Sequence, residues 1–369
     1  MFRKTGRGEK GDVRFDVHRH VPLPSPLSLL AIGLLSLTGC SRDHRTPLVI
    51  YSPHGRDLLS LFEHRFEALH PDIDVRWLDM GSQDVYDRVR SERANPQADV
   101  WFGGPSLILA PAAHDSLLDC ARPAWAGAIP ARARGSGDCY FAAYETPVVF
   151  LYPEKVVRAE DAPQDWDDLL DPKWTGKIII RDPLASGTMR AVFGFIIERG
   201  LKQTGDTAAG FAWLRRLDGQ TKAYEQNPAL VSERIARQEG LLTVWDLPDV
   251  LISRRRGMPI GYVFPKSGTV AIEDGIAVVR GAKHIAAARG FVDFVGSPEM
   301  QLAAAREVYR LPARLDLPAD SLPDWVRDVR RRMVVADVDW NLLAEHGPEW
   351  MRWWDQHVRG TGHREGSRR

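Results

Sequence analysis

Several signatures of catalysis are missing from this chain of 369 residues. It has no Gly-x-Ser-x-Gly nucleophile elbow, no His-Glu-x-x-His zinc motif and no Walker phosphate loop. These absences argue against serine hydrolases, zinc proteases and nucleotide hydrolases of the common kinds. A net charge is missing too, since 49 lysines and arginines balance 49 aspartates and glutamates. This balance argues against a nucleic-acid-binding surface spread over the whole molecule.

Cysteine is also scarce. The three cysteines, Cys40, Cys120 and Cys139, have a spacing that fits no metal site. Cys40 follows a basic start and an apolar run over residues 27–37, which is too short to span a bilayer. The run ends in Leu37-Thr-Gly-Cys40, which resembles a bacterial lipobox. We therefore expect residues 1–39 to be a lipoprotein signal peptide and Cys40 to carry the lipid; an ordinary secretory signal is the alternative.

Export would place the other two cysteines in an oxidising compartment. Cys120 and Cys139 would then either form a disulfide bond or remain two separate buried thiols. A disulfide between them would close a loop of about twenty residues and contribute roughly 3 kcal/mol in the chain-entropy model. The sequence leaves both alternatives open.

The length exceeds the size at which one hydrophobic core keeps growing, so two lobes are expected. Short apolar strands alternate with helical segments along the chain, which predicts sheets in which the turns after parallel strands gather at one edge. Turns near Ser52, Ser82 and Gly104 should therefore line one crevice. The predicted strands cover residues 48–52, 73–78, 99–105, 144–152, 176–181, 241–244 and 272–279, and residues 260–264 are expected to cross back to the first lobe.

The helices are predicted from apolar residues at helical spacing and from their start signals. Asn227-Pro228 is such a start, because proline is favoured at the first position of a helix. The first helix has an apolar stripe made by Leu58, Phe62, Phe66 and Leu69. Further helices are expected over residues 163–174, 227–238 and 285–305, and a polar tail from Gly360 onward is expected to be disordered.

The loop Asp182-Pro-Leu-Ala-Ser-Gly-Thr188 is the stretch around which the chain is organised. It joins a β-branched strand to a helix with an apolar stripe, so Ser186 or Thr188 should cap that helix. A loop of this kind directs backbone N–H groups, hydroxyls and the positive end of a helix dipole at one point, which suits an anion. An ordinary capped connection between strand and helix is the alternative.

Four motifs follow the lipobox in order. They are Val49-Ile-Tyr-Ser-Pro-His-Gly55, Asn95-Pro-Gln-Ala-Asp-Val-Trp101 with Gly103-Gly104, Trp166-Asp-Asp-Leu-Leu-Asp-Pro-Lys-Trp-Thr-Gly-Lys177 and Ser186-Gly-Thr188. In this order they resemble the extracellular solute-binding proteins of bacterial ABC importers. Within these, the chain is most similar to the branch that contains ferric-ion, phosphonate and sugar-phosphate binders.

The resemblance implies an α/β, type II periplasmic-binding-protein-like fold with two lobes, a ligand cleft between them and two crossing hinge strands. We expect a tether at residues 40–47, a first lobe at 48–143 and 266–308, a second lobe at 144–265 and 309–359, and the tail at 360–369. The implied protein is an exported, lipid-tethered monomer in the periplasm without enzymatic activity, cofactor or nucleic-acid partner. Its implied partners are a small ligand and the permease and ATPase of an importer.

One departure from the family bears on the ligand. Ferric binders of this family use two adjacent tyrosines in the second lobe, whereas this chain has no such pair and carries Thr243-Val-Trp-Asp-Leu-Pro-Asp249 at the corresponding place. We therefore expect a small organic anion such as a phosphorylated sugar, a phosphonate or a carboxylate. Trp245 could stack on an uncharged part of the ligand and Asp246 could accept its hydroxyl hydrogen bonds, or both could be structural.

The predicted ligand-binding residues are Ser52, His54, Gly55, Ser82, Gln83, Gly104, Thr146, Ser186, Gly187, Thr188, Trp245 and Asp246. A metal site is not expected. The alternatives are a ferric or ferric-complex binder that uses His54, Asp246 or Glu145 with an exogenous anion, an exported enzyme on the same scaffold, and a scaffold protein with a degenerate cleft.

Overall fold

The computed structural model describes residues 44–362. The predicted signal peptide, Cys40 and residues 363–369 of the predicted tail lie outside the described residues. Within residues 44–362, no helix is both long enough and apolar enough to cross a membrane.

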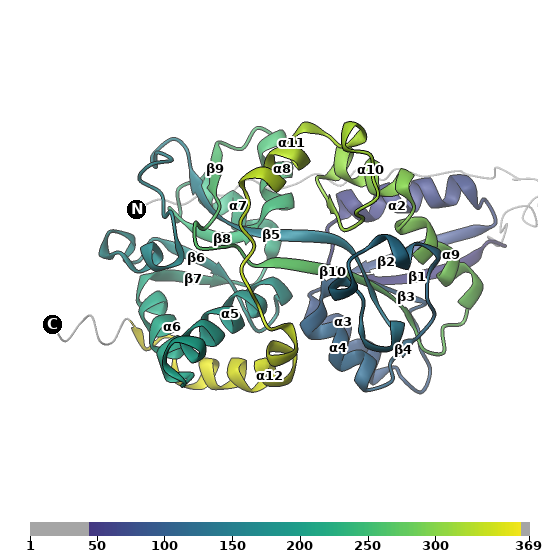
Figure 1. Ribbon diagram of the computed structural model, residues 1–369, viewed down its shortest axis with the longest axis horizontal. Helices are drawn as coiled ribbons and strands as arrows, with labels where there is room; N and C mark the ends of the chain where they lie inside the picture. The colour runs from purple at the N-terminus through teal and green to yellow at the C-terminus, as the bar shows by residue number, and fades with distance from the viewer. Residues whose placement is uncertain (1–43, 363–369) are drawn as a thin grey trace, which may run out of the picture. The chain divides into compact units, whose positions relative to one another are not determined.

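A mixed sheet forms the first lobe. β1 (Thr46–Ser52) lies between the parallel strands β2 (Ile73–Asp79) and β3 (Val100–Pro105), and β10 (Ala271–Val279) runs antiparallel beside β3 (Figure 1). Helices cover both faces, which explains why the strands are rich in apolar residues. α2 (Arg56–Leu69), α9 (Ile285–Val295) and α10 (Pro298–Val308) share one apolar core, and α3 (Ser82–Ser91) and α4 (Ser106–His114) belong to another. The first three predicted strands are confirmed.

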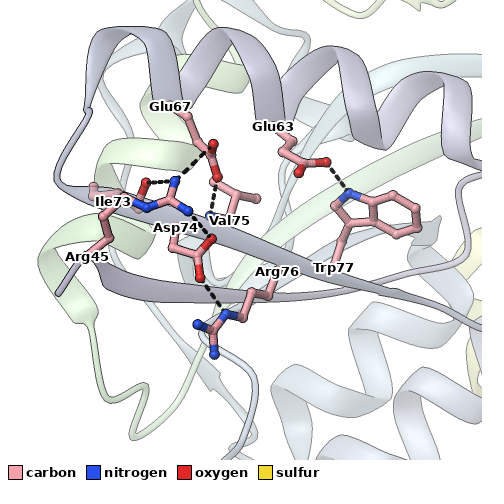
Figure 2. A network of polar contacts seen from close by, with 8 residues as sticks. All are labelled: Arg45, Glu63, Glu67, Ile73, Asp74, Val75, Arg76 and Trp77. Carbon is pink, nitrogen blue, oxygen red and sulfur yellow. Dashed lines mark hydrogen bonds and ion pairs between the residues drawn. The ribbon is translucent and has the colours of Figure 1, made fainter. Parts of the chain in front are cut away.

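α2 is fastened to β2 by the polar network shown in Figure 2. Glu67 accepts a hydrogen bond from the Val75 backbone at 2.8 Å, and Glu63 accepts one from the Trp77 indole at 2.7 Å. The predicted apolar stripe of α2 is buried except at Leu69, which is 64% exposed because it is the last residue of the helix and no neighbour covers it. These bonds hold the second half of α2 against β2.

Two strands cross between the lobes. The first half of β5 (Phe141–Pro153) pairs with β10 and with β11 (Leu311–Pro312), and its second half pairs with β8 (Thr243–Asp246) and β9 (Ile260–Val263). The expectation that residues 260–264 cross back is wrong, because β9 stays beside the second half of β5. The returning strand is β10, whose other edge pairs with β3 and, at its end, with β4 (Leu118–Asp119).

The second lobe adds a parallel pair, β6 (Ile178–Arg181) and β7 (Thr221–Glu225). Its helices are α5 (Gly187–Thr204), α6 (Ala208–Gln220), α7 (Pro228–Ala236), α8 (Leu247–Arg255), α11 (Asp324–Arg332) and α12 (Trp340–His357). α12 packs against α5 and also reaches α4 of the first lobe (Figure 1). The start of α7 at Asn227-Pro228 is confirmed.

Two predicted helices are broken by proline. Residues 163–174 form two short 3-10 helices, η4 (Trp166–Leu170) and η5 (Pro172–Trp174), because Asp171 ends one turn and caps the next. The predicted helix over 285–305 is two helices, α9 and α10, since Ser297 caps a new helix that begins at Pro298. Four other 3-10 turns are η1 (Ala124–Ala128), η2 (Ala131–Ala133), η3 (Ser136–Asp138) and η6 (Ala319–Ser321).

Two further features close the description of the chain. Cys120 and Cys139 are joined by a disulfide bond. At the C-terminal end, the backbone N–H groups of Gly360 and Gly362 donate to the Asp218 carboxylate at 3.0 and 2.9 Å. The beginning of the predicted polar tail is therefore hydrogen-bonded to α6.

Candidate functional site

A cavity of about 480 Å³ lies where the strands of both lobes end. The turns after β1, β2 and β3 line it from the first lobe, and the turns after β6, β7 and β8 line it from the second. Ligands in α/β proteins bind at such carboxyl ends of strands, because the connecting turns bring backbone N–H groups and side chains together there. The crevice expected from the order of strands and turns is therefore present.

Six helices begin at this cavity. Their N-cap residues all line it: Gly55, Gly81, Pro105, Ser186, Asn227 and Asp246. The Ser186 hydroxyl accepts from the Met189 backbone at 3.2 Å, so the cap predicted for α5 is confirmed. Each helix start carries a partial positive charge, and several of them directed at one space favour an anion.

The start of α5 packs directly on the first lobe. A Cβ atom at Gly187 would lie 2.7 Å from the Pro105 ring and 2.9 Å from the Ser82 hydroxyl. Only glycine allows this approach of the two lobes. Gly104 has a φ of 110°, and its N–H donates to Asp274 at 2.6 Å.

Two buried arginines line the cavity, and the sequence analysis missed both as ligand residues. Arg181, 5% exposed, ends β6 and donates to the Glu225 carbonyl at 3.0 Å. Arg310, also 5% exposed, follows α10, and its one ion pair among residues 44–362 is with Asp249, with 4.0 Å between the charged atoms. Arg181 directly precedes the loop 182–188, so its position in the sequence could have identified it as a ligand-binding candidate. Arg310 lies far along the chain, and no sequence pattern connects it to the site.

Carboxylates also line the cavity. Asp246 accepts from the Thr188 hydroxyl at 3.2 Å, and Asp274 accepts from the Thr146 hydroxyl at 3.3 Å. Burial, together with the negative charges of Asp249 and Asp274, raises the pKa of Asp246 well above its ordinary value. Burial also raises the pKa of Asp249, although Arg310 and a hydrogen bond from Trp245 lower it. Asp79 and Asp84 complete the acidic part of the lining.

His54 is uncharged in this setting. Its ring is 5% exposed, and Nε2 lies 3.6 Å from the Asp274 carboxylate. Burial lowers the pKa of His54 to about 4, even though Asp274 favours the charged form. The Ser52 hydroxyl donates to the Phe102 carbonyl at 2.5 Å and accepts from the His54 backbone at 3.0 Å. Ser52 thus supports the turn that carries His54.

Ten of the twelve predicted ligand-binding residues line the cavity, and Ser52 and Gln83 do not. The side chains of these two residues bond within the protein instead. Ser52 holds its own turn, and Gln83 accepts from Arg190 and donates to Asp87. Glu145, named for a metal alternative, lies outside the cavity and pairs with Arg132 at 3.0 Å.

Of the three donors named for a metal site, His54 and Asp246 therefore line the cavity and Glu145 does not. Within the described part of the chain, no group of three or more His, Cys, Asp or Glu side chains is arranged to hold a metal ion.

Comparison with known proteins gives the family. The model of the bacterial extracellular solute-binding protein family matches residues 64–331. A Salmonella paratyphi A protein provisionally named as a 2-aminoethylphosphonate-binding periplasmic protein is 27% identical over 307 residues, which are 80% of this chain and 87% of that protein.

Two solved structures show the same fold. The periplasmic binding protein AfuA from Actinobacillus pleuropneumoniae, with fructose-6-phosphate bound, matches with a TM-score of 0.75 and 24% identity over 85% of this chain and 99% of that one. The ferric binding protein from Campylobacter jejuni matches with a TM-score of 0.72 and 20% identity over 84% of this chain and 98% of that one. The chain therefore belongs to the bacterial extracellular solute-binding proteins, and it is a substrate-binding protein of an ABC importer with the two-lobed type II fold.

Proposed function

We propose that this protein captures a small organic phosphonate or phosphate ester between its lobes and delivers it to the permease of the importer. The observation that carries the proposal is the convergence of six helix starts and two buried arginines on one cavity. Each helix start favours an anion by about 0.3–1 kcal/mol when exposed, and by up to about 2 kcal/mol when partly buried. A tetrahedral oxyanion has enough acceptor atoms to use several of these donors at once.

Capture works by closure of the lobes. β5 and β10 join the lobes, and the contacts between them lie on both sides of the cavity. On one side Gly187 meets Pro105 and Ser82; on the other, Arg256 after α8 binds both Asp57 carboxylate oxygens at 2.8 and 2.6 Å. A ligand that touches both lobes stabilises the closed state, which is the form that the permease would recognise.

The names of similar proteins support a phosphorus-containing ligand. One relative is provisionally named for 2-aminoethylphosphonate, and one structural neighbour holds fructose-6-phosphate. The ferric alternative has the Campylobacter protein in its favour. The cavity gives the ferric alternative less support. His54 and Asp246 line the cavity, but Glu145 does not, and the chain has no adjacent tyrosines. Members of the family are binding proteins, so the family gives no support to the enzyme alternative.

The anchoring of the protein is a separate proposal. We propose that Cys40 carries a lipid that tethers a monomeric binding protein in the periplasm, on the strength of Leu37-Thr-Gly-Cys40. Incorporation of labelled fatty acid into the wild type and its loss in Cys40→Ser would support this. Equal labelling of both would contradict it.

To test the binding function, we compare two variants, each of which loses the N-cap of one helix. Ser186→Ala with Thr188→Val removes the cap and a hydroxyl at the cavity, and Ser297→Ala removes the equivalent cap of α10, where Ser297 accepts from Met300 at 3.2 Å. Each lost cap should lower stability by about 1 kcal/mol. Calorimetric titration with 2-aminoethylphosphonate and fructose-6-phosphate should show weakened binding only in the first variant. Equal binding by both variants would make the loop 182–188 purely structural.

A further inference from the structure

One corner of the cavity has an unusual balance of charge. We call it the acidic corner: Asp246, Asp249 and Asp274 around Arg310, beside His54. Three carboxylates face one guanidinium, and the imidazole does not offset the excess because burial lowers the pKa of His54 to about 4. Like charges this close oppose each other unless a cation or a proton is present.

Not all of these carboxylates have partners in the protein. Asp274 is held by the Gly104 N–H at 2.6 Å and the Thr146 hydroxyl at 3.3 Å. Asp246 uses one oxygen for the Thr188 hydroxyl, while its other oxygen, Oδ1, is buried and has no hydrogen-bond partner among the described residues. The Asp249 side chain is 42% exposed and faces Arg310 at 4.0 Å.

Arg310, in turn, has hydrogen-bond donors without acceptors among the described residues. Its side chain is almost fully buried, and within residues 44–362 the guanidinium donates no hydrogen bond; the Asp249 carboxylate at 4.0 Å is too far away for one. A guanidinium has five N–H donors, and burying donors without acceptors is costly. The corner therefore offers donors and acceptors side by side, both directed at a space that a ligand can fill.

Charge decides which ligand groups fit. A hydroxyl could accept from Arg310 and donate to Asp246, but a proton on one of the carboxylates would still be needed to relieve the excess of negative charge. A bare anion would relieve Arg310 and add to the excess. An ammonium group beside an oxyanion satisfies the donors, the acceptors and the charge together.

We propose, on the basis of the binding function proposed above, that the ligand is a zwitterion whose ammonium group is held by Asp246 and Asp249 and whose oxyanion is held by Arg310. The acidic corner is then what selects among phosphorus-containing anions. Recognition of the amine also explains why three aspartates gather in one corner of a cavity that otherwise favours anions.

Three probes with one skeleton test this inference. 2-Aminoethylphosphonate, 2-hydroxyethylphosphonate and propylphosphonate differ only in an ammonium, hydroxyl or methyl end group. Calorimetric titration should show the amino probe binding at least about tenfold more tightly than the other two. Asp246→Asn should reduce that preference to less than about threefold, because the amide keeps the shape and removes the charge. Arg310→Gln should weaken all three probes, since each carries the phosphonate.

Asp84→Asn serves as the matched control. It removes the same charge from the lining near Arg181, so it should change the affinities of the three probes alike and leave their ratio unchanged. Asp249→Asn repeats the test if Asp246→Asn does not fold. Equal binding of the three probes, or tighter binding of the hydroxyl probe, would overturn the inference while the binding function stands. Failure of all three to bind would overturn the proposed phosphonate function and the inference with it.

Discussion

The two lobes present their helix starts to the cavity in different ways. In the first lobe, α2 and α3 begin at Gly55 and Gly81, and neither N-cap supplies a side-chain hydrogen bond. In the second lobe, α5 and α7 begin at Ser186 and Asn227, whose side chains accept from their own helices. The first lobe therefore offers bare backbone N–H groups. The second offers two helices that are already capped and one, α8, whose N-cap Asp246 makes no side-chain hydrogen bond to its own helix.

The difference assigns different tasks to the lobes. Bare helix starts attract any anion of suitable size, because backbone N–H groups and dipoles do not distinguish one oxyanion from another. The second lobe contributes Arg181, Trp245, Asp246 and Asp249, whose side chains differ in shape and charge. We expect changes in the first lobe to alter affinity for all anions together, and changes in the second lobe to alter the preference among them.

The largest effect should follow from separating the lobes. Gly187→Val places a branched side chain where even a Cβ would lie 2.7 Å from the Pro105 ring, so the lobes could no longer meet. Affinity should fall at least about a thousandfold, or about 4 kcal/mol, because the ligand would contact one lobe only. Gly290→Val makes the same change in α9 with nothing within 4 Å, and should bind normally. Normal binding by Gly187→Val would show that closure at this contact is not needed.

The next largest effect should be a loss of stability at low pH, caused by His54 in the first lobe. Because the pKa of His54 is lowered to about 4 in the folded protein, the unfolded chain binds a proton that the folded protein does not between about pH 6.5 and pH 4. Stability should therefore fall by about 3 kcal/mol as the pH drops through this window. His54→Gln should flatten this part of the profile in denaturant unfolding. An unchanged slope would mean that His54 is charged in the folded protein.

A smaller effect should come from the end of the chain. Arg359 pairs with Asp182, the first residue of the second-lobe loop, and Asp182 also accepts from Gln226 and from the Leu184 backbone. Arg359→Gln leaves a buried carboxylate without its cation, so affinity for phosphonates should fall about tenfold.

A second substitution separates positioning from general loss of stability. Asp182→Asn in the Arg359→Gln background removes the unpaired charge and should restore part of the affinity, as expected for a positioning residue. Arg352→Gln changes an exposed arginine on α12, the helix that ends just before Arg359; it is the control and should bind normally. If the double variant binds more weakly than either single variant, Arg359 does not act through Asp182.

The smallest effect should appear when the first lobe is made to resemble the second. Gly55→Ser would supply a side-chain cap to α2, and its Cβ would meet nothing within 4 Å. Stability should rise by a few tenths of a kcal/mol. Affinity for all anions should fall about two- to threefold, because one helix N–H is then taken by the cap. A change in preference between amino and methyl phosphonates would contradict the division of tasks between the lobes.

Sequence patterns predicted the parts of the site that depend on interactions between residues close together in the chain. The loop 182–188 could be found because a β-branched strand, a cap residue and an apolar helix stripe follow each other within a few residues. Ser297-Pro298 carried an equally local signal for the start of a helix, which the prediction of one helix over 285–305 overlooked.

What could not be predicted depends on long-range packing. Asp274 reaches the cavity because β10 pairs with β3 and β5, and Arg310 reaches it beside Asp249 in the first turn of α8; both contacts join segments far apart in the sequence. The orientation of Ser52 and Gln83 is also decided by partners elsewhere, Phe102 and Arg190. Residue type and turn position alone do not show whether a hydroxyl or amide faces a ligand or the protein.

The most direct measurement is a calorimetric titration of the wild-type protein with 2-aminoethylphosphonate, fructose-6-phosphate and ferric citrate. The account predicts saturable one-site binding of at least one phosphorus compound, with 2-aminoethylphosphonate the tightest. It also predicts that this binding is lost or strongly weakened in the Ser186→Ala, Thr188→Val variant. Binding of ferric citrate alone, or binding of a phosphorus compound that the variant leaves unchanged, would contradict the account.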